Sequence, residues 1–268
     1  KHYRRRRGTH RRKTLLTYPN GSGLSLRTRI ALIVQREVGR IGAIFWLIPI
    51  VFVMRFLMRY KVKDAKALRE RYRTLLRTSD GPVLICPNHL TMVDSALIAW
   101  ALGGSWWYLF NYSRIPWNIP EYTKYAFLWP NRVGAWITKC IPVIRGGRRQ
   151  DVSHVIKRVQ HLLSQGDTAL IFAESGRSRT GRVRSDSVAH SVGRILNSVD
   201  GCRALCVYLR GDRQDTWSTF PARSNSFYVD FEVFKPRSEH SGLRRSRDFS
   251  QQIVGRLVSM EKEYFARR

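Results

Sequence analysis

The sequence predicts an α/β fold, with a mostly parallel or mixed central sheet flanked by helices and a helical hairpin on the N-terminal side. Short apolar runs of strand length alternate with segments of helical periodicity from Pro82 onward, and this alternation is typical of α/β sheets. Two of these runs are followed by polar side chains of types that can act in catalysis or bind a substrate. At 268 residues the chain is long enough for one domain with a small appendage.

The charge of the chain is unusual. It has 48 Lys and Arg against 19 Asp and Glu, a formal net charge of +29, although its 43% hydrophobic share is ordinary. Such an excess attracts polyanions: anionic lipid head groups, nucleic acid or an acidic protein. The alternative is that part of this positive charge belongs to a solvated surface without a specific partner.

We divide the chain into a basic flexible arm over residues 1–25, a membrane-associating helical hairpin over 26–60 and an α/β domain over 61–268. Residues 1–13, KHYRRRRGTHRRK, are almost purely basic and cannot bury a core. An arm of this kind suits an anionic membrane surface and RNA equally. No cleavable signal peptide is expected, because the start of the chain has no apolar core with a small-residue cleavage site.

Two apolar stretches make up the expected hairpin. Ile30 to Val34 is followed by charged residues, and Ile41 to Met54 then runs without charge between Arg40 and Arg55. The second stretch, if helical, spans about 21 Å, which is less than the roughly 30 Å of a hydrocarbon core, and Pro49 interrupts it. We therefore expect a hairpin that dips into one leaflet, with a pair of core helices covering the sheet as the alternative.

The later elements follow from local patterns of apolar residues. Residues 64–78 are predicted to form an amphipathic helix rich in Arg. Further helices are expected from apolar residues at helical spacing, with Asp151 and Ser185 as caps, over 151–164, 186–198 and 249–264. Short apolar runs predict strands over 83–86, 106–110, 141–144, 168–173, 204–209 and 226–234.

An aromatic and proline-bearing region over residues 112–136 suits the wall or lid of an apolar tunnel. Its aromatic side chains include Trp117, Tyr122, Tyr125, Phe127 and Trp129. Aromatic residues at this density are more often plain core, so both alternatives stay open.

The first predicted strand that ends in candidate catalytic residues lies in Pro82 to Ser95, which reads PVLICPNHLTMVDS. His89 follows the apolar run Val83 to Cys86 at the point where a buried strand would end, and Asp94 begins an apolar helix five residues later. The imidazole and the carboxylate would lie side by side. A neutral His can then take a proton from a hydroxyl group while the carboxylate fixes its tautomer. An ordinary strand-end His and a helix cap are the alternative.

The second strand end delivers Glu174 and Arg177 from the run over 168–173. Arg177 is the expected phosphate ligand, because a guanidinium binds phosphate oxygens through two parallel hydrogen bonds. Gly176 lets the loop turn tightly, and Glu174 could orient Arg177 or contact the substrate, with a structural salt bridge as the alternative. Arg145, followed by two glycines, could also approach a phosphate, and a simple basic loop fits this segment nearly as well.

The four cysteines are expected to be buried, reduced thiols of a cytoplasmic protein. They lie in or beside apolar runs, and none forms a CxxC pair. The Cys202–Cys206 spacing has no His or Cys neighbours that would complete a zinc site, so no metal is expected.

Together these segments resemble the glycerolipid acyltransferase family (the 1-acylglycerol-3-phosphate, PlsC-like type) over about residues 80–211. Asn88-His89, followed by Asp94-Ser95, is similar to the first motif of that family. Residues 172–178, FAESGRS, are similar to its third motif, Phe-Pro-Glu-Gly-Thr-Arg-Ser, with Ala in place of Pro and Ser-Gly in place of Gly-Thr. Residues 141–146 resemble the second motif without the Asp often found before its Arg, and residues 205–208 the fourth without its Pro.

The resemblance implies a membrane-associated O-acyltransferase. Such an enzyme moves a fatty acyl group from a thioester, acyl-CoA or acyl carrier protein (acyl-ACP), to the hydroxyl of a lysophospholipid, with lysophosphatidic acid as the default acceptor. The residues that match the family's base and orienting carboxylate are His89 and Asp94. The remaining matched or nearby residues are expected to bind substrate: Asn88, Arg145, Glu174, Gly176, Arg177 and Ser178.

The resemblance further implies no cofactor beyond the acyl donor. Its location would be the cytoplasmic face of a membrane, such as the bacterial inner membrane, with monotopic or peripheral attachment. Because the third motif departs from the family pattern, another acceptor, such as an amino-acid lipid or a glycolipid, stays open.

The competing class is a non-enzymatic basic protein that grips nucleic acid. It explains the charge and residues 1–13, but not why a His/Asp pair and a Glu/Arg pair both follow predicted strands. A hydrolase would need a nucleophile or a metal set that the pattern does not offer.

Overall fold

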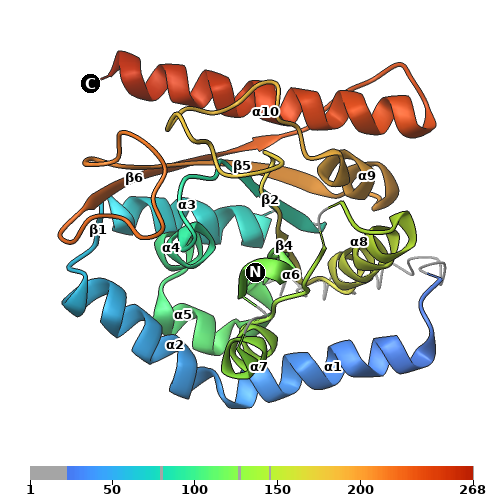
Figure 1. The fold of residues 1–268 in the computed structure, drawn as a ribbon, viewed down its shortest axis with the longest axis horizontal. Coiled ribbons are helices and arrows are strands. Elements are labelled where there is room, and N and C mark those ends of the chain that lie inside the picture. Colours follow the sequence, from blue (N-terminus) through green and yellow to red (C-terminus); the bar gives the residue numbers. More distant parts are fainter. Residues whose placement is uncertain (1–22, 79–80, 126–127, 145, 268) are drawn as a thin grey trace, which may run out of the picture.

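The computed structural model describes residues 23–78, 81–125, 128–144 and 146–267, and every structural statement below concerns these residues (Figure 1). Most of the predicted basic arm therefore lies outside the described residues, as do Arg145 and Phe127.

One six-stranded sheet forms the centre of the fold, in the order β1-β6-β5-β2-β4-β3. All neighbouring strands run parallel except β5 and β6, which are antiparallel. The sheet is thus mixed, as the sequence predicted. The strands are β1 (Lys61–Val62), β2 (Val83–Pro87), β3 (Trp117–Asn118), β4 (Thr168–Leu170), β5 (Arg203–Gly211) and β6 (Ser226–Phe234).

Helices cover both faces of the sheet. The helices are α1 (Leu26–Ile41), α2 (Ala43–Phe52), α3 (Ala65–Thr78), α4 (Asp94–Leu102), α5 (Ser105–Phe110), α6 (Tyr122–Tyr125), α7 (Trp129–Ile137), α8 (Arg149–Ser164), α9 (His190–Ser198) and α10 (Gly242–Ala266). A π-helical turn, η1 (Val53–Leu57), continues α2, and a 3-10 turn, η2 (Tyr112–Arg114), follows α5. In Figure 1, α10 lies above β5 and β6, α3 and α4 lie below them, and α1 and α2 run along the bottom.

Successive residues of β2 supply two separate cores, because side chains alternate across a strand. Leu84 and Cys86 pack into the cluster under α8, α9 and α10. Val83 and Ile85 pack into the cluster under α3 and α4. β2 is buried along its whole length, so its carboxyl end is a well-fixed place for a functional side chain.

The prediction of a strand over residues 106–110 is wrong, since these residues form α5. Gly103 and Gly104, the latter at φ +75°, end α4 and allow the chain to start a second helix at once. Tyr108 is then buried against Leu47 of α2 in a third small core. A short aromatic run fits a helix face and a strand equally well, and this contact with α2 decides for the helix.

Three further predictions need correction. Residues 141–144 form no strand and make only an isolated bridge between Val143 and Glu121. The helix predicted over 186–198 begins later, at His190, because Val188 pairs with Glu174 as extended backbone. Asp151 lies in the first turn of α8, where the cap position belongs to Arg148.

The region predicted as a hairpin forms α1 and α2, which meet at a bend of 62° and follow one another along the bottom of the molecule (Figure 1), so they do not fold back on each other as a hairpin would. Among the described residues no single helix is long and apolar enough to cross a membrane, whereas this bent pair together meets the criteria of length and composition. Polar bonds tie α1 to the domain: Gln35 Nε2 donates to the carbonyls of Trp136 (2.9 Å) and Cys140 (3.0 Å). Arg36 forms an ion pair with the buried Asp167 at 3.4 Å.

Candidate active site

The first predicted pair is in direct contact at the carboxyl end of β2. His89 Nδ1 lies 3.1 Å from Asp94 Oδ2, and Asp94 occupies the first position of α4. The same carboxylate oxygen accepts hydrogen bonds from the backbone N–H groups of Leu90 (2.6 Å) and Thr91 (2.7 Å). The other oxygen, Oδ1, accepts from Thr91 Oγ1 at 2.5 Å.

These bonds define the chemical roles within the pair. Two backbone donors already converge on Asp94 Oδ2, so the carboxylate is the acceptor and His89 Nδ1 carries the proton that it donates. The lone pair of His89 then remains on Nε2. This is the tautomer in which an imidazole can take a proton from a hydroxyl group.

The loop after β4 holds the histidine from the other side. The ring of Phe172 stacks on the ring of His89, with centroids 3.7 Å apart and an angle of 18° between the planes. Glu174 Oε1 accepts the backbone N–H of His89 (3.0 Å), and Ser178 donates its backbone N–H to the carbonyl of His89 (3.0 Å). Both polar backbone groups of the histidine are thus bonded to one loop, which fixes its position.

Glu174 is almost completely buried, and its second oxygen accepts the backbone N–H of Arg184 at 3.1 Å. Burial raises the pKa of this carboxyl group to about 7, although the N–H groups of Arg184 and His89 partly oppose the rise. Of the three roles considered from the sequence, neither an ion pair with Arg177 nor another salt bridge of Glu174 is formed among the described residues, and contact with the substrate stays a prediction. Glu174 instead accepts hydrogen bonds from the backbone N–H groups of His89 and Arg184.

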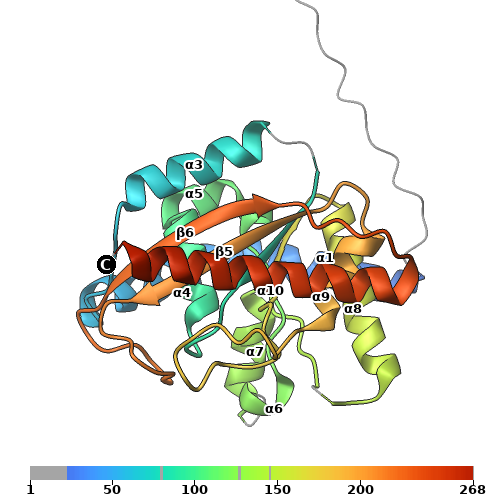
Figure 2. The same cartoon turned by 90° about the horizontal axis from the view of Figure 1, so that it is seen from above.

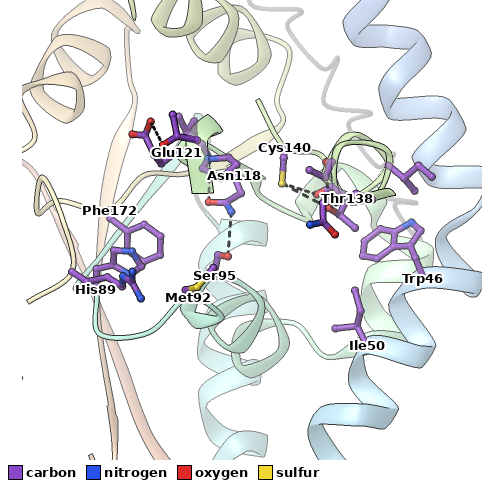
Figure 3. A pocket seen from close by; sticks show the side chains of 18 of the residues that line it. Trp46, Ile50, His89, Met92, Ser95, Asn118, Glu121, Thr138, Cys140 and Phe172 are labelled. Carbon is purple, nitrogen blue, oxygen red and sulfur yellow. Dashed lines mark hydrogen bonds between the residues drawn. The ribbon is translucent and has the colours of Figure 1, made fainter. Parts of the chain in front are cut away.

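A cavity of about 930 Å³ opens beside His89. Figure 3 shows His89 and Phe172 at one end and Trp46 and Ile50 of α2 at the other. Asn118 and Ser95, joined by a hydrogen bond of 3.2 Å, lie between these ends. A smaller and largely apolar cavity of about 150 Å³ continues between α2, α4 and α5, and shares part of this lining.

Arg177 lines the same cavity as His89. Its guanidinium lies over the ring of Trp217, 5.0 Å from the ring centre, a contact that holds a cation without neutralising it. Its buried Nη1 has no hydrogen-bond partner among the described residues. An orphaned donor at the wall of a cavity is suited to an anionic ligand.

The other predicted substrate-binding residues have different positions. The side-chain amide of Asn88 is buried and exchanges two hydrogen bonds with the backbone of Leu209 (3.0 and 2.8 Å), which ties the end of β2 to β5. Ser178 is buried beside Thr180, and the half-exposed Gly176 lies in the loop between Glu174 and Arg177. None of Asn88, Gly176 and Ser178 lines the cavity.

The predicted wall region over residues 112–136 does line part of the cavity, through Asn118, Ile119, Pro120, Glu121 and Thr123 and through residues of α7. Sequence reasoning missed the contributions of α2 and of Ser95, because such apolar or small side chains resemble ordinary core residues in sequence. Of the predicted aromatic wall, Trp117 is plain core. The described residues contain no group of three His, Cys, Asp or Glu side chains that could hold a metal ion.

The fold and the site define a class: α/β proteins with a hydrogen-bonded His–Asp pair at the carboxyl end of a central parallel strand. A comparison with protein-family models matches the Acyltransferase family over residues 59–229, well over half of the chain. The chain therefore belongs to this family of PlsC-like glycerolipid acyltransferases and is an O-acyltransferase of that general kind. A search of curated proteins found no match.

Proposed function

We propose that this acyltransferase moves a fatty acyl group from a thioester to the hydroxyl of a lysophospholipid, with lysophosphatidic acid giving phosphatidic acid as the leading candidate. The observation that carries the proposal is the shared cavity: it brings together a His–Asp base and an Arg with an orphaned donor, and it adjoins a smaller apolar cavity.

In the proposed reaction His89 Nε2 takes the proton of the acceptor hydroxyl as that oxygen attacks the thioester carbonyl carbon. Asp94 stabilises the imidazolium that forms. The carbon–sulfur bond then breaks, and the proton passes from His89 to the departing sulfur, which leaves as the thiol of CoA or of acyl carrier protein. An oxygen ester forms, and His89 returns to its neutral state.

Arg177 is the proposed ligand of the acceptor's phosphate. The cation–π contact with Trp217 holds the guanidinium at the cavity wall, and the orphaned Nη1 supplies a donor for a phosphate oxygen. Binding the phosphate there would keep the acceptor hydroxyl near His89, which is the positional effect that such an enzyme needs. Arg145, the second predicted phosphate ligand, lies outside the described residues.

The apolar end of the cavity is the proposed place of the acyl chain. Trp46, Pro49 and Ile50 of α2 form one wall of the large cavity, and Ala99 and Tyr108 line the small one beyond it. An acyl chain placed there would gain about 0.8 kcal/mol for each buried methylene group.

Membrane association through α1 and α2 is a further part of the proposal. These helices expose large apolar side chains, with Phe45 81% exposed and Ile41 and Ile44 exposed beside it. Trp129 of α7 is also exposed, and Figure 1 shows α7 next to α1 and α2. We infer that this side lies in one leaflet at the cytoplasmic face of a membrane, where a lipid acceptor resides.

The experiment that tests the proposal is acyl transfer from labelled acyl-CoA, and separately from acyl-ACP, to lysophosphatidic acid, with wild type and His89→Ala compared. We expect product from the wild type and at least about a hundredfold loss in the variant. The thermal unfolding of both proteins serves as the control for folding. Equal activity of the two proteins would exclude His89 as the base. Product formed only with an acceptor that lacks phosphate would exclude lysophosphatidic acid as the acceptor.

A further inference from the structure

A second large hollow lies away from the catalytic cavity and shares none of its lining residues. It has a volume of about 860 Å³ and lies between η1, β1, α3 and the end of α4. We call it the basic groove, because its charged lining residues are Arg55, Lys61, Lys66, Arg69, Glu70, Arg73 and Arg77. A single carboxylate therefore faces six cationic side chains.

The cations of the basic groove lack anionic partners. No salt bridge among the described residues includes any of the six, or Glu70. Neighbouring cations do have such partners: Lys63 pairs with Asp212 at 2.8 Å, and Arg71 pairs with Asp230 at 2.9 Å. The missing compensation is thus a property of the groove and not of this side of the protein as a whole.

Two arginines at the bottom of the groove are held in place by the end of α4. Arg69 donates to the carbonyls of Trp100 (3.0 Å) and Ala101 (3.3 Å), and Arg73 donates to the carbonyl of Gly103 (3.0 Å). Arg73 Nε is buried and has no hydrogen-bond partner in the part of the chain that the structure describes. Burial and the nearby charges of Arg73 and Arg55 lower the pKa of Arg69, so a bound anion would relieve the repulsion among these groups.

Exposed aromatic side chains lie on η1, which supplies Arg55 to the groove, and on α5, which lies beside α3. Phe56 of η1 is 58% exposed, and the guanidinium of Arg55 lies 5.8 Å from the centre of its ring. On the α5 side, Trp106 is 70% exposed and Phe110 85%. The guanidinium of Arg73 lies 5.5 Å from the ring centre of Trp107, which places α5 beside α3, as Figure 2 shows.

We propose that the basic groove binds the phosphate head group of an anionic phospholipid of the membrane. A cluster of Arg and Lys side chains, with exposed aromatic side chains on the adjacent elements, is the arrangement of a protein surface that sits at the head-group level. The site rests on the membrane docking proposed above, because η1 continues directly from α2. It is separate from the acceptor site, so the lipid bound there would anchor and orient the enzyme without being consumed.

The test measures binding of the full chain to vesicles of phosphatidylcholine alone and of phosphatidylcholine with phosphatidylglycerol. The groove variant is Arg55→Gln/Lys66→Gln/Arg77→Gln, which spares the two arginines that hold the end of α4. The matched control, Lys235→Gln/Arg244→Gln/Arg247→Gln, removes the same charge from exposed positions on and near α10, on the far side of the molecule from α2 (Figure 1).

Wild type and control should gain the same affinity from phosphatidylglycerol, and the groove variant should lose at least about tenfold of that gain. All three should bind phosphatidylcholine vesicles equally. An equal loss in the two variants would mean that only net charge matters, and no loss in either would mean that the groove does not bind anionic lipid; both results overturn the proposal. Loss of transfer from acyl-ACP with unchanged vesicle binding would assign the groove to an acidic protein instead.

The outcomes also separate this proposal from the proposed function. Failure of the wild type to bind phosphatidylcholine vesicles would refute the docking through α1 and α2, while the gain from phosphatidylglycerol would still report on the groove. Acyl transfer in detergent with the groove variant should equal that of the wild type, because none of its three substituted residues lines the large or the small cavity.

Discussion

Replacing Asp94 by Asn removes the negative charge beside His89 and leaves the hydrogen bonds in place. Asp94 Oδ2 faces the N–H groups of Leu90 and Thr91 and the Nδ1 of His89. An amide nitrogen there would point at two backbone donors, so the amide oxygen must take this position. The nitrogen then faces the hydroxyl of Thr91, which can turn and accept.

The expected loss of activity follows from the charge alone. Unit charges about 4 Å apart interact by about 4 kcal/mol at an effective dielectric constant of about 20, which corresponds to about a thousandfold in rate. Because the imidazolium is only partly formed in the transition state, we expect kcat/KM to fall by about 10²–10³ in Asp94→Asn. The assay is acyl transfer to the acceptor that the wild type uses best.

The variant Asp94→Ala serves as the structural comparison. It would leave the buried N–H groups of Leu90 and Thr91 without acceptors, at about 1–3 kcal/mol each, so it should unfold at clearly lower denaturant concentration. Asp94→Asn should unfold close to the wild type. A folded Asn variant that loses less than about tenfold would refute the argument that the Asp94 charge supports proton transfer by His89.

Three further predictions concern the loop after β4 and the cavity. Arg177→Gln should raise KM for a phosphate-bearing acceptor about 10–100-fold through the loss of charged hydrogen bonds, with KM for the acyl donor unchanged. The control Arg179→Gln, at an exposed neighbouring position, should change neither KM. Equal effects of the two substitutions would contradict the assignment of Arg177 as the phosphate ligand. Because folding raises the pKa of Glu174 to about 7, the folded state binds the extra proton, so this residue should lower stability by about 3 kcal/mol as pH rises from about 4.5 to 7. Denaturant unfolding across that pH range should show a smaller loss of unfolding free energy for Glu174→Gln than for the wild type. If the unfolding free energies of both proteins fall equally with pH, the raised pKa of Glu174 is disproved. Ala99→Leu narrows the smaller cavity and should shift preference toward shorter acyl thioesters by roughly fourfold per methylene; a competition assay with unchanged preference would argue against an acyl chain there.

The parts of the fold that the sequence predicts well are those with strong local signals. β2, β5 and β6 are found where alternating or continuous apolar runs lie, and α4 begins at Asp94 as expected. The two-residue strands β1 and β3 were not predicted, because pairs such as Lys61–Val62 carry no periodicity. Their positions are set by neighbouring strands and not by their own residues.

The site was predictable only where chemistry is concentrated in a few polar side chains. The contact between His89 and Asp94 was predictable from their places at a strand end and a helix start, which fix both positions, and not from their spacing alone. The role of Asn88 could not be read from sequence, because it depends on Leu209, a residue far along the chain on the neighbouring strand. The contact of Glu174 with the backbone of His89 was equally out of reach, since it joins two loops.

The contribution of α2 to the cavity has a practical consequence for anyone who produces this enzyme. Trp46, Pro49 and Ile50 form part of the cavity wall, yet they precede the family-matched segment, which begins at residue 59. A shortened protein that starts at residue 59 would lose one side of the cavity beside His89. It would also expose the apolar surfaces that pack against α2. Solubility should therefore be improved by changing outward-facing residues such as Phe45, and not by removing α1 and α2.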